Sequence, residues 1–196
     1  PFEGQLTTRG FDYDTCGVDA LSHATVKDGL IVLSSGMAYR LLVLPDSTFM
    51  TSKLLDRVDS LVRAGATVLG PMPLHSPSLQ GFPADDTSVQ SRAAKFWKKA
   101  QDVKGVPSGV AVSGLSLEQA LSLQGIAPDV IISSVGKAAR ARWIHRVAGD
   151  ADIYFVSNQK PRSESLDFSF RITGKAPELW HADTGVIEPA PVWHLD

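Results

Sequence analysis

The sequence has little cysteine, little net charge and no long hydrophobic run. A single cysteine, Cys16, among 196 residues excludes an internal disulfide and any metal site built from several cysteines. The formal net charge of −2 at pH 7 is not that of a basic surface for nucleic acid or anionic membranes. No apolar run reaches the roughly 18 to 20 residues of a membrane-spanning helix. The sequence therefore predicts neither a nucleic-acid partner nor a membrane partner.

The size and composition are those of a globular protein with a real core. Hydrophobic residues make up 43% of the chain and charged residues 20%. The length suffices for one full domain and a smaller appendage. The sequence begins without methionine and without a signal peptide, so we expect a mature, processed or excised chain. Its residues alone do not fix a compartment.

A strand–helix–strand unit begins near Tyr39. Residues 39–45 are almost continuously apolar and end at Pro45, which is typical of a strand covered on both faces. Thr51 can cap an amphipathic helix that follows, and residues 67–70 form a second short apolar strand. A helix between two buried strands predicts a parallel crossover unit.

Other predicted helices and strands surround this unit. They are a hairpin turning at 27–29, a helix over about 88–100 opened by a capping box of Thr87 and Gln90, a strand over 109–114 and a helix capped by Ser116. This alternation predicts an α/β fold. We expect a mainly parallel, flavodoxin-like (glutamine-amidotransferase-like) sheet with helices on both faces, in a domain spanning residues 1–140.

The pattern changes to β-structure after about residue 140. Residues 142–147 and 152–158 flank a turn and predict a β-hairpin, and residues 165–172 alternate as a half-buried antiparallel strand does. We therefore expect a second region, 141–196, with a hairpin and part of a β-sandwich. Its apolar face should be exposed and need a partner surface, which favours self-association. That face consists of Leu166, Phe168, Phe170, Trp180 and Trp193.

Several motifs in order along the chain resemble the α-L-rhamnosidases of glycoside hydrolase family 106. The resemblance runs from about Gly10 to Gly185, nearly the whole chain. Its motifs are GFDYD (10–14), YRLLVLPDS (39–47), LVRAGATVLGPMP (61–73), SPSLQGFP (76–83), IAPDV (126–130), WIHRVAGDADIYFVSNQ (143–159) and ELWHADTG (178–185).

The resemblance implies an accessory part of a larger enzyme. In that family a (β/α) barrel carries the catalytic carboxylates and a bound calcium, and an α/β domain and β-sandwich modules follow it. This chain is similar to the α/β domain and the start of the sandwich region, and no stretch of it matches the barrel. The resemblance therefore assigns no catalytic residue, metal ligand or cofactor here. It implies a neighbouring barrel as partner, a rhamnose-containing glycan as ligand, and a periplasmic or extracellular parent.

Five residues are candidates for the rim of a sugar site. Ligands bind at the carboxyl ends of strands in open α/β sheets, where the loop 71–87 should lie. The loop contains His75 and Phe82, and the GFDYD segment supplies Asp12, Tyr13 and Asp14. Polar and aromatic side chains of this kind are typical of sugar-binding sites. The alternative interpretation is an ordinary surface loop without a ligand.

His145 and Arg146 are candidates for an interdomain role. They belong to the predicted hairpin, and Arg146 could reach Asp150 or Asp152 across its turn. The alternative is an exposed charge at the rim of the domain. The remaining histidines, His75, His181 and His194 among them, are too scattered to suggest a zinc site.

Two other functions remain open at this point. A stand-alone hydrolase could use Cys16 as an amidotransferase-type nucleophile, which needs a sharp strand-to-helix turn and an activating histidine. No apolar strand precedes Cys16, so we expect an ordinary packed cysteine instead. The chain could also be a carbohydrate-binding or oligomerisation module. By itself we expect it to lack catalysis.

Overall fold

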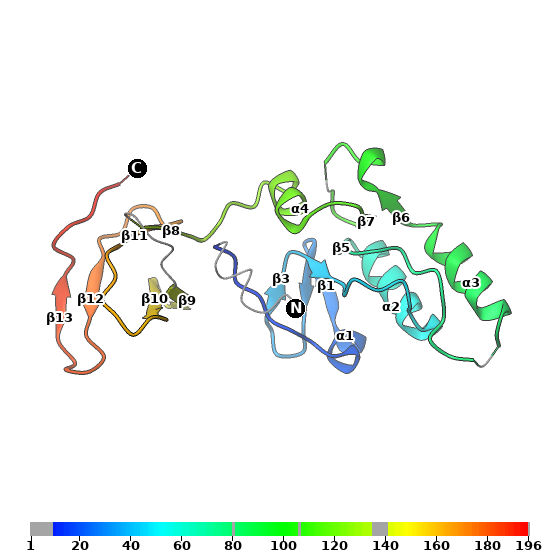
Figure 1. The fold of residues 1–196 in the computed structure, drawn as a ribbon, viewed down its shortest axis with the longest axis horizontal. Helices are drawn as coiled ribbons and strands as arrows, with labels where there is room; N and C mark the ends of the chain where they lie inside the picture. Colours follow the sequence, from blue (N-terminus) through cyan, green and yellow to red (C-terminus); the bar gives the residue numbers. More distant parts are fainter. Residues whose placement is uncertain (1–9, 80, 106, 135–140, 196) are drawn as a thin grey trace. The chain divides into compact units, whose positions relative to one another are not determined.

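The structure is a computed structural model that describes residues 10–79, 81–105, 107–134 and 141–195. By its contacts the chain forms two compact units (Figure 1). Unit 2 is Asp14–Ala127, and unit 1 combines the described residues of Pro1–Tyr13 and Pro128–Asp196. The two domains predicted from the sequence, 1–140 and 141–196, stay a prediction.

Unit 2 contains a four-stranded sheet in the order β4-β5-β7-β6. The strands are β4 (Leu42–Val43), β5 (Thr67–Leu69), β6 (Trp97–Lys99) and β7 (Val110–Ser113). All three neighbouring pairs are parallel, with Val68 opposite both Leu42 and Ala111. The predicted parallel crossover unit is therefore confirmed, and the fold is mixed α/β.

Helices pack on both faces of this sheet. The helices of unit 2 are α1 (Val18–His23), α2 (Ser52–Arg63), α3 (Ala84–Ala93) and α4 (Leu117–Leu123), with a 3-10 turn, η2, at Ala100–Asp102. Residues of α2 and α3 share a core with Val68 and Ala111. Because successive strand residues point to opposite faces, the core that Ala120 of α4 shares with Leu69 and Val112 lies on the other face.

Two predicted helix starts are confirmed. The side chain of Thr51 accepts a hydrogen bond from the Leu54 backbone at 3.2 Å, as a helix cap does. Ser116 and Gln119 form a full capping box at the start of α4. Both satisfy backbone N–H groups that a helix leaves unpaired at its first turn.

The predicted helix over 88–100 is wrong at both ends. The helix begins at Ala84, after Pro83, with Asp85 and Asp86 in its first turn, so Thr87 and Gln90 form no capping box at its start. It ends at Ala93, and Trp97 belongs to strand β6 instead. The Trp97 indole is buried beside the sheet, where its Nε1 donates to the Gly70 carbonyl at 3.0 Å. That bond and the burial favour the strand over a longer helix.

A small antiparallel sheet precedes the parallel one. It consists of β1 (Thr25–Lys27), β2 (Leu30–Val32) and β3 (Ala38–Tyr39) in that order. Its first turn confirms the predicted hairpin, with Asp28 and Gly29 both at positive φ. The predicted strand 39–45 is therefore divided, because Tyr39 pairs with β2 and only Leu42–Val43 joins the parallel sheet.

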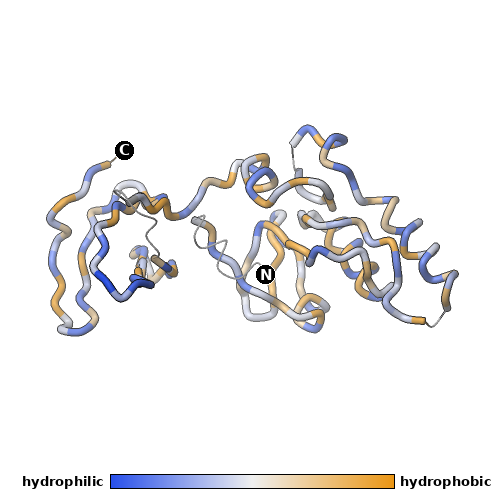
Figure 2. Tube along the Cα trace, viewed as in Figure 1, coloured by the Kyte–Doolittle hydropathy of each residue, from blue (hydrophilic) through white to orange (hydrophobic). Residues whose placement is uncertain are grey.

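Unit 1 is built from three antiparallel strand pairs. They are β9 (Ala141–Ala148) with β10 (Ala151–Asn158), β8 (Val130–Ser134) with β11 (Leu166–Phe170), and β12 (Glu178–Trp180) with β13 (Ile187–Pro189). The predicted hairpin and the predicted half-buried strand are both confirmed. Figure 2 shows that hydrophobic stretches recur along the strands of both units.

Aromatic side chains form the interior of unit 1. Trp143 of β9 is only 2% exposed, and the ring of Tyr154 lies 4.4 Å from that of Phe170. Phe168 stacks on Phe170 in turn. The expected exposed apolar face is therefore correct for Trp180 and Trp193 but wrong for Leu166, Phe168 and Phe170, which are half-buried.

The start of the described chain is tied into unit 1. The Gly10 carbonyl accepts a hydrogen bond from the Asp129 backbone at 2.7 Å. Gly10 has a φ of +82°, and a Cβ atom there would lie 2.1 Å from the Val130 carbonyl oxygen. Only glycine fits this close approach without a shift of the backbone. Within the described residues, no helix combines the length and apolar character that crossing a bilayer requires.

Candidate functional site

Six polar side chains meet on the inner side of the β9–β10 hairpin. We name this group the His145 cluster; it consists of Asp129, His145, Asp152, Tyr154, Arg171 and Lys175. The antiparallel register places His145 directly opposite Tyr154. Residues two apart on a strand share a face, so Asp152 and Tyr154 approach the imidazole from the same side of the hairpin.

His145 bridges two carboxylates. Its Nδ1 lies 2.8 Å from Oδ2 of Asp129, and its Nε2 lies 2.8 Å from Oδ1 of Asp152. All three side chains are largely buried. The ring also stacks on Tyr154, with centroids 4.1 Å apart and planes 14° from parallel. The imidazole is therefore held on both edges and on one face.

Two cations and a phenol complete the His145 cluster. Arg171 and the Tyr154 hydroxyl both donate to Oδ1 of Asp129, at 3.1 and 3.3 Å. Lys175 donates to Oδ2 of Asp152 at 2.5 Å. Hydrogen bonds from Lys175 and then from His145 hold the pKa of Asp152 below its usual value. Burial, followed by the nearby charge of Asp129, raises the pKa of the Tyr154 hydroxyl.

The chemistry of this cluster is that of a structural tie. Each of the four carboxylate oxygens of Asp129 and Asp152 already has a hydrogen-bond partner. A glycosidase needs one carboxyl that stays protonated as an acid and a second that faces substrate. The fully bonded carboxylates here serve to fix the hairpin against the segments that carry Asp129, Arg171 and Lys175.

Arg146 has a different environment from the one predicted. It donates to the backbone carbonyl of His145 at 2.8 Å, and its NH1 lies 4.0 Å from Oδ2 of Asp12. Asp152, one of the two carboxylates that Arg146 was expected to reach, is bonded to His145 and Lys175 instead. The Arg146 side chain is mostly exposed. Its proposed interdomain role stays a prediction, as does that of His145.

A second polar group lies beyond the carboxyl ends of β4 and β5. His75 donates from Nδ1 to Oδ2 of Asp86 at 3.1 Å, and Oδ1 of the same carboxylate accepts the Ser76 backbone N–H at 2.7 Å. These bonds, the one from Ser76 first, lower the pKa of Asp86. The exposed ring of Phe49 packs beside His75, with centroids 5.3 Å apart.

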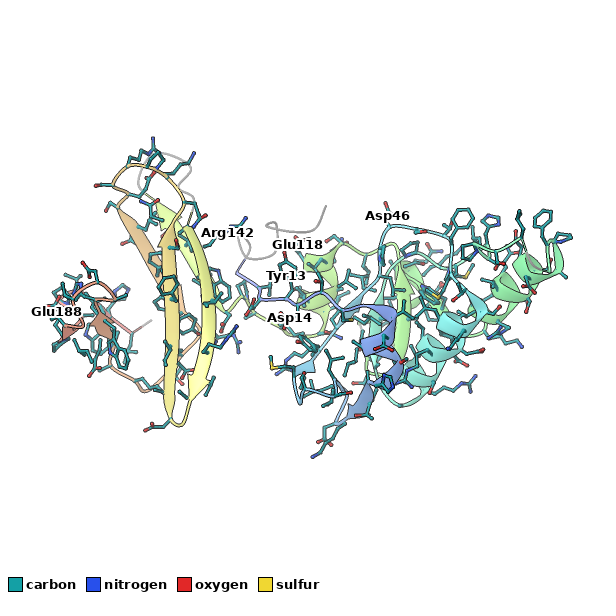
Figure 3. The ribbon with its side chains drawn as sticks, turned by 90° about the horizontal axis from the view of Figure 1, so that it is seen from below. Tyr13, Asp14, Asp46, Glu118, Arg142 and Glu188 are labelled. Atoms are coloured by element: carbon teal, nitrogen blue, oxygen red, sulfur yellow. The ribbon has the colours of Figure 1, made fainter. Side chains whose placement is uncertain are left out.

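The five predicted rim residues divide between the two units. Asp12 and Tyr13 belong to unit 1, whereas Asp14, His75 and Phe82 belong to unit 2. Asp12 accepts the Tyr13 backbone N–H at 3.0 Å, and Asp14 accepts the Tyr39 hydroxyl at 2.5 Å. Figure 3 marks Tyr13 and Asp14 on the segment that precedes α1. Phe82 is exposed within the predicted loop 71–87. A shared sugar-site rim stays a prediction.

The expectation of a packed Cys16 is wrong, because its side chain is exposed. Residues 11–17 form no strand, so Cys16 has no apolar neighbour strand to pack against. The same fact counts against a nucleophile at Cys16, because the strand-to-helix turn that would present the thiol is missing.

Neither polar group coincides with a metal-ligand arrangement among the described residues or with the pocket between α2 and α3. In the described parts of the chain, no three His, Cys, Asp or Glu side chains are arranged to hold a metal ion. A pocket of about 150 Å³ lies between α2 and α3, lined by Leu55, Asp59, Arg63, Arg92, Lys95 and Phe96, none of which belongs to either polar group.

Several members of the two groups were not anticipated from the sequence. They are Phe49, Asp129, Tyr154, Arg171 and Lys175. The sequence contained one indication of the His145 cluster. His145 and Tyr154 occupy interior positions of an alternating hairpin, where apolar residues are usual. Their partner Asp129 is distant in sequence and carries no such pattern.

The α/β sheet and the antiparallel strand pairs agree with the non-barrel part of a glycoside hydrolase that the motifs resemble. A family model for α-L-rhamnosidases, glycoside hydrolase family 106, matches residues 4–193. The chain belongs to this family. The resemblance carried by the GFDYD and ELWHADTG motifs is thereby confirmed.

Two relatives are similar to nearly the whole of this chain over a small part of their own length. A Formosa agariphila protein named as a provisional β-glucuronidase is 33% identical over 194 residues, which are 98% of this chain and 16% of that protein. A solved rhamnosidase structure from Novosphingobium sp. PP1Y is 32% identical with a TM-score of 0.74, covering 87% of this chain and 16% of that one. The chain thus spans about a sixth of the length of these relatives.

Proposed function

We propose that this chain is a non-catalytic accessory part of a rhamnosidase-like glycoside hydrolase. One observation carries the proposal: the carboxylates gathered in its two polar groups are engaged in ion pairs and backbone hydrogen bonds. Asp129 and Asp152 are bonded within the His145 cluster, and Asp86 is bonded to His75 and Ser76. Such carboxylates are not available as an acid and a nucleophile on either side of a glycosidic bond.

The electrostatics of these carboxylates support the same conclusion. A general acid for glycoside cleavage needs a raised pKa so that it keeps its proton near neutral pH. The pKa values of Asp86 and Asp152 are lowered by hydrogen bonds from Ser76 and Lys175, respectively. Both groups are therefore ionised at neutral pH and cannot donate a proton to a leaving group.

The accessory role we propose is to support a neighbouring catalytic barrel in an exported enzyme. The extent of the similarity supports this role, because the chain matches only about 16% of the length of each relative. Self-association through exposed residues such as Trp180 and Trp193 is the alternative partner. A rhamnose-containing glycan is the ligand that the family suggests for the whole enzyme.

At the level of fold, we propose that unit 2 is a doubly wound domain of the flavodoxin-like kind. Parallel strands with helices on both faces support this assignment. The observed order β4-β5-β7-β6 differs from the 2-1-3-4-5 order of flavodoxin itself. An experimental structure that resolves every strand at the sheet edges will test the assignment.

The functional proposal is tested with the purified chain and aryl glycosides. We expect no release of the aryl group from aryl α-L-rhamnosides or from aryl β-D-glucuronides. Turnover that persists at constant specific activity through a second, unrelated purification step would overturn the proposal. Replacement of the exposed thiol by Cys16→Ser then separates the hypotheses, because loss of such turnover identifies a cysteine hydrolase.

A further inference from the structure

The loops that follow β4 and β5 are joined by backbone hydrogen bonds. Leu74 and His75 both donate to the Thr48 carbonyl, at 2.8 and 3.1 Å, and Met50 donates to the His75 carbonyl at 3.0 Å. A parallel bridge pairs Phe49 with His75. The two loops therefore form a fixed edge rather than two independent segments, and they lie where open α/β sheets bind ligands.

The imidazole on this edge has a defined orientation. Asp86 holds Nδ1 of His75, and the carboxylate is itself anchored by the Ser76 backbone N–H. Among the described residues, Nε2 of His75 has no hydrogen-bond partner. In the neutral ring this atom offers a lone pair, and in the charged ring it offers an N–H, so a hydroxyl group can pair with either form.

An aromatic face lies next to this polar atom. The Phe49 ring is 58% exposed although it packs at 5.3 Å and 36° against His75. Asp46, on the same loop after β4, is also exposed (Figure 3). An apolar ring beside a single oriented nitrogen has the polarity of a sugar ring, which presents C–H groups on one face and hydroxyls around its edge.

We propose that Phe49 and His75 form a saccharide contact in which a sugar ring stacks on Phe49 and a hydroxyl bonds Nε2 of His75. This inference rests on the proposed function, since it assumes that the chain lies near a glycan. Asp86 acts as a positioning residue that fixes the imidazole. The contact is open and involves one ring and one hydrogen bond. Its affinity for sugar is therefore weak, with a Kd in the millimolar range or higher.

Nuclear magnetic resonance of the 196-residue chain tests the proposal. Methyl α-L-rhamnoside and methyl β-D-glucuronide are titrated separately, and amide shifts are followed. We expect saturable shifts for at least one sugar, centred on Thr48–Met50 and Leu74–Ser76. Phe49→Ala and Phe49→Leu should both abolish saturation, because leucine keeps apolar bulk but lacks the aromatic face. Asp86→Asn should weaken binding at least threefold.

The matched control is Phe155→Ala, because Phe155 is 57% exposed, like Phe49, but lies on β10 in unit 1. This variant should bind sugar as the unchanged chain does. The proposal fails if neither sugar gives saturable shifts, if Phe49→Ala keeps them, or if glycerol reproduces them. Thermal melting of each variant checks the fold. Sugar release is a separate assay, so failure of binding leaves the accessory role standing.

Discussion

The imidazole of His145 and the phenol of Tyr154 are stacked 4.1 Å apart across the β9–β10 hairpin. The contact brings a polar ring into the aromatic interior that includes Trp143 and Phe170. Such a position is tolerated because both ring nitrogens of His145 are bonded. The hairpin is thus fixed by polar and aromatic contacts at the same residue.

Removal of this imidazole should destabilise unit 1. His145→Ala leaves Asp129 and Asp152 facing each other without the bridging ring, and we expect a loss of about 1–3 kcal/mol. Urea denaturation followed by the amide signals of β9 and β10 measures it. His181→Ala is the control, because the His181–Glu188 pair is exposed and its loss should cost at most about 0.5 kcal/mol. Equal losses for both variants would contradict the structural role.

Acid should weaken unit 1 through Asp152. Lys175, and then His145, lowers the pKa of this carboxyl from the ordinary 3.8, so the folded form binds its proton less readily than the unfolded form. The stabilisation is present above 3.8 and is lost as the pH falls through the lower, folded value. Melting temperatures are measured between pH 2 and 6 from the amide signals of β10. We expect them to decrease as the pH falls below 3.8 and through the lower pKa of the folded form.

A variant that lacks the main partner of Asp152 tests the acid prediction. Lys175→Gln removes the largest cause of the lowered pKa and should flatten the fall in melting temperature below pH 4. Lys160→Gln changes a half-buried lysine elsewhere in unit 1 and should leave the profile unchanged. An identical profile for all three proteins would show that Asp152 does not govern the acid response.

The buried indole of Trp97 should be sensitive to a small change. Trp97→Phe removes the bond from Nε1 to the Gly70 carbonyl and leaves that carbonyl without this partner. We expect a loss of about 1–3 kcal/mol from the missing bond and the space left behind. Denaturant unfolding of unit 2 measures it. Trp193→Phe, at an exposed tryptophan, should change stability by no more than about 0.5 kcal/mol.

Local sequence patterns predicted the parts of the fold that depend on neighbouring residues. The cap at Thr51 and the capping box at Ser116 involve partners three residues away, and the turn at Asp28 involves adjacent ones. The segment around Trp97 was misassigned because Val89, Ala93, Phe96 and Trp97 recur at helical spacing, although an apolar pair such as Phe96 and Trp97 also fits a short buried strand. Tertiary packing beside Gly70 decides between them.

The polar groups could be predicted only in part for the same reason. His145 and His75 were recognised as unusual, but Asp129 is 16 residues from the first and Asp86 is 11 from the second. Arg171 reaches Asp129 over 42 residues. No periodicity links such positions, so these partners follow from the three-dimensional arrangement alone.

The hydrogen bond between Gly10 and Asp129 makes unit 2 an insertion into unit 1. The chain leaves unit 1 after Tyr13 and returns to it at Pro128, so residues 14–127 are inserted between two segments of unit 1 that this hydrogen bond joins. Expression of residues 128–196 alone would remove the Gly10 carbonyl that the backbone at the start of β8 bonds to. A truncated chain intended to isolate the β-region therefore has to retain the segment around Gly10 as well as residues 128–196.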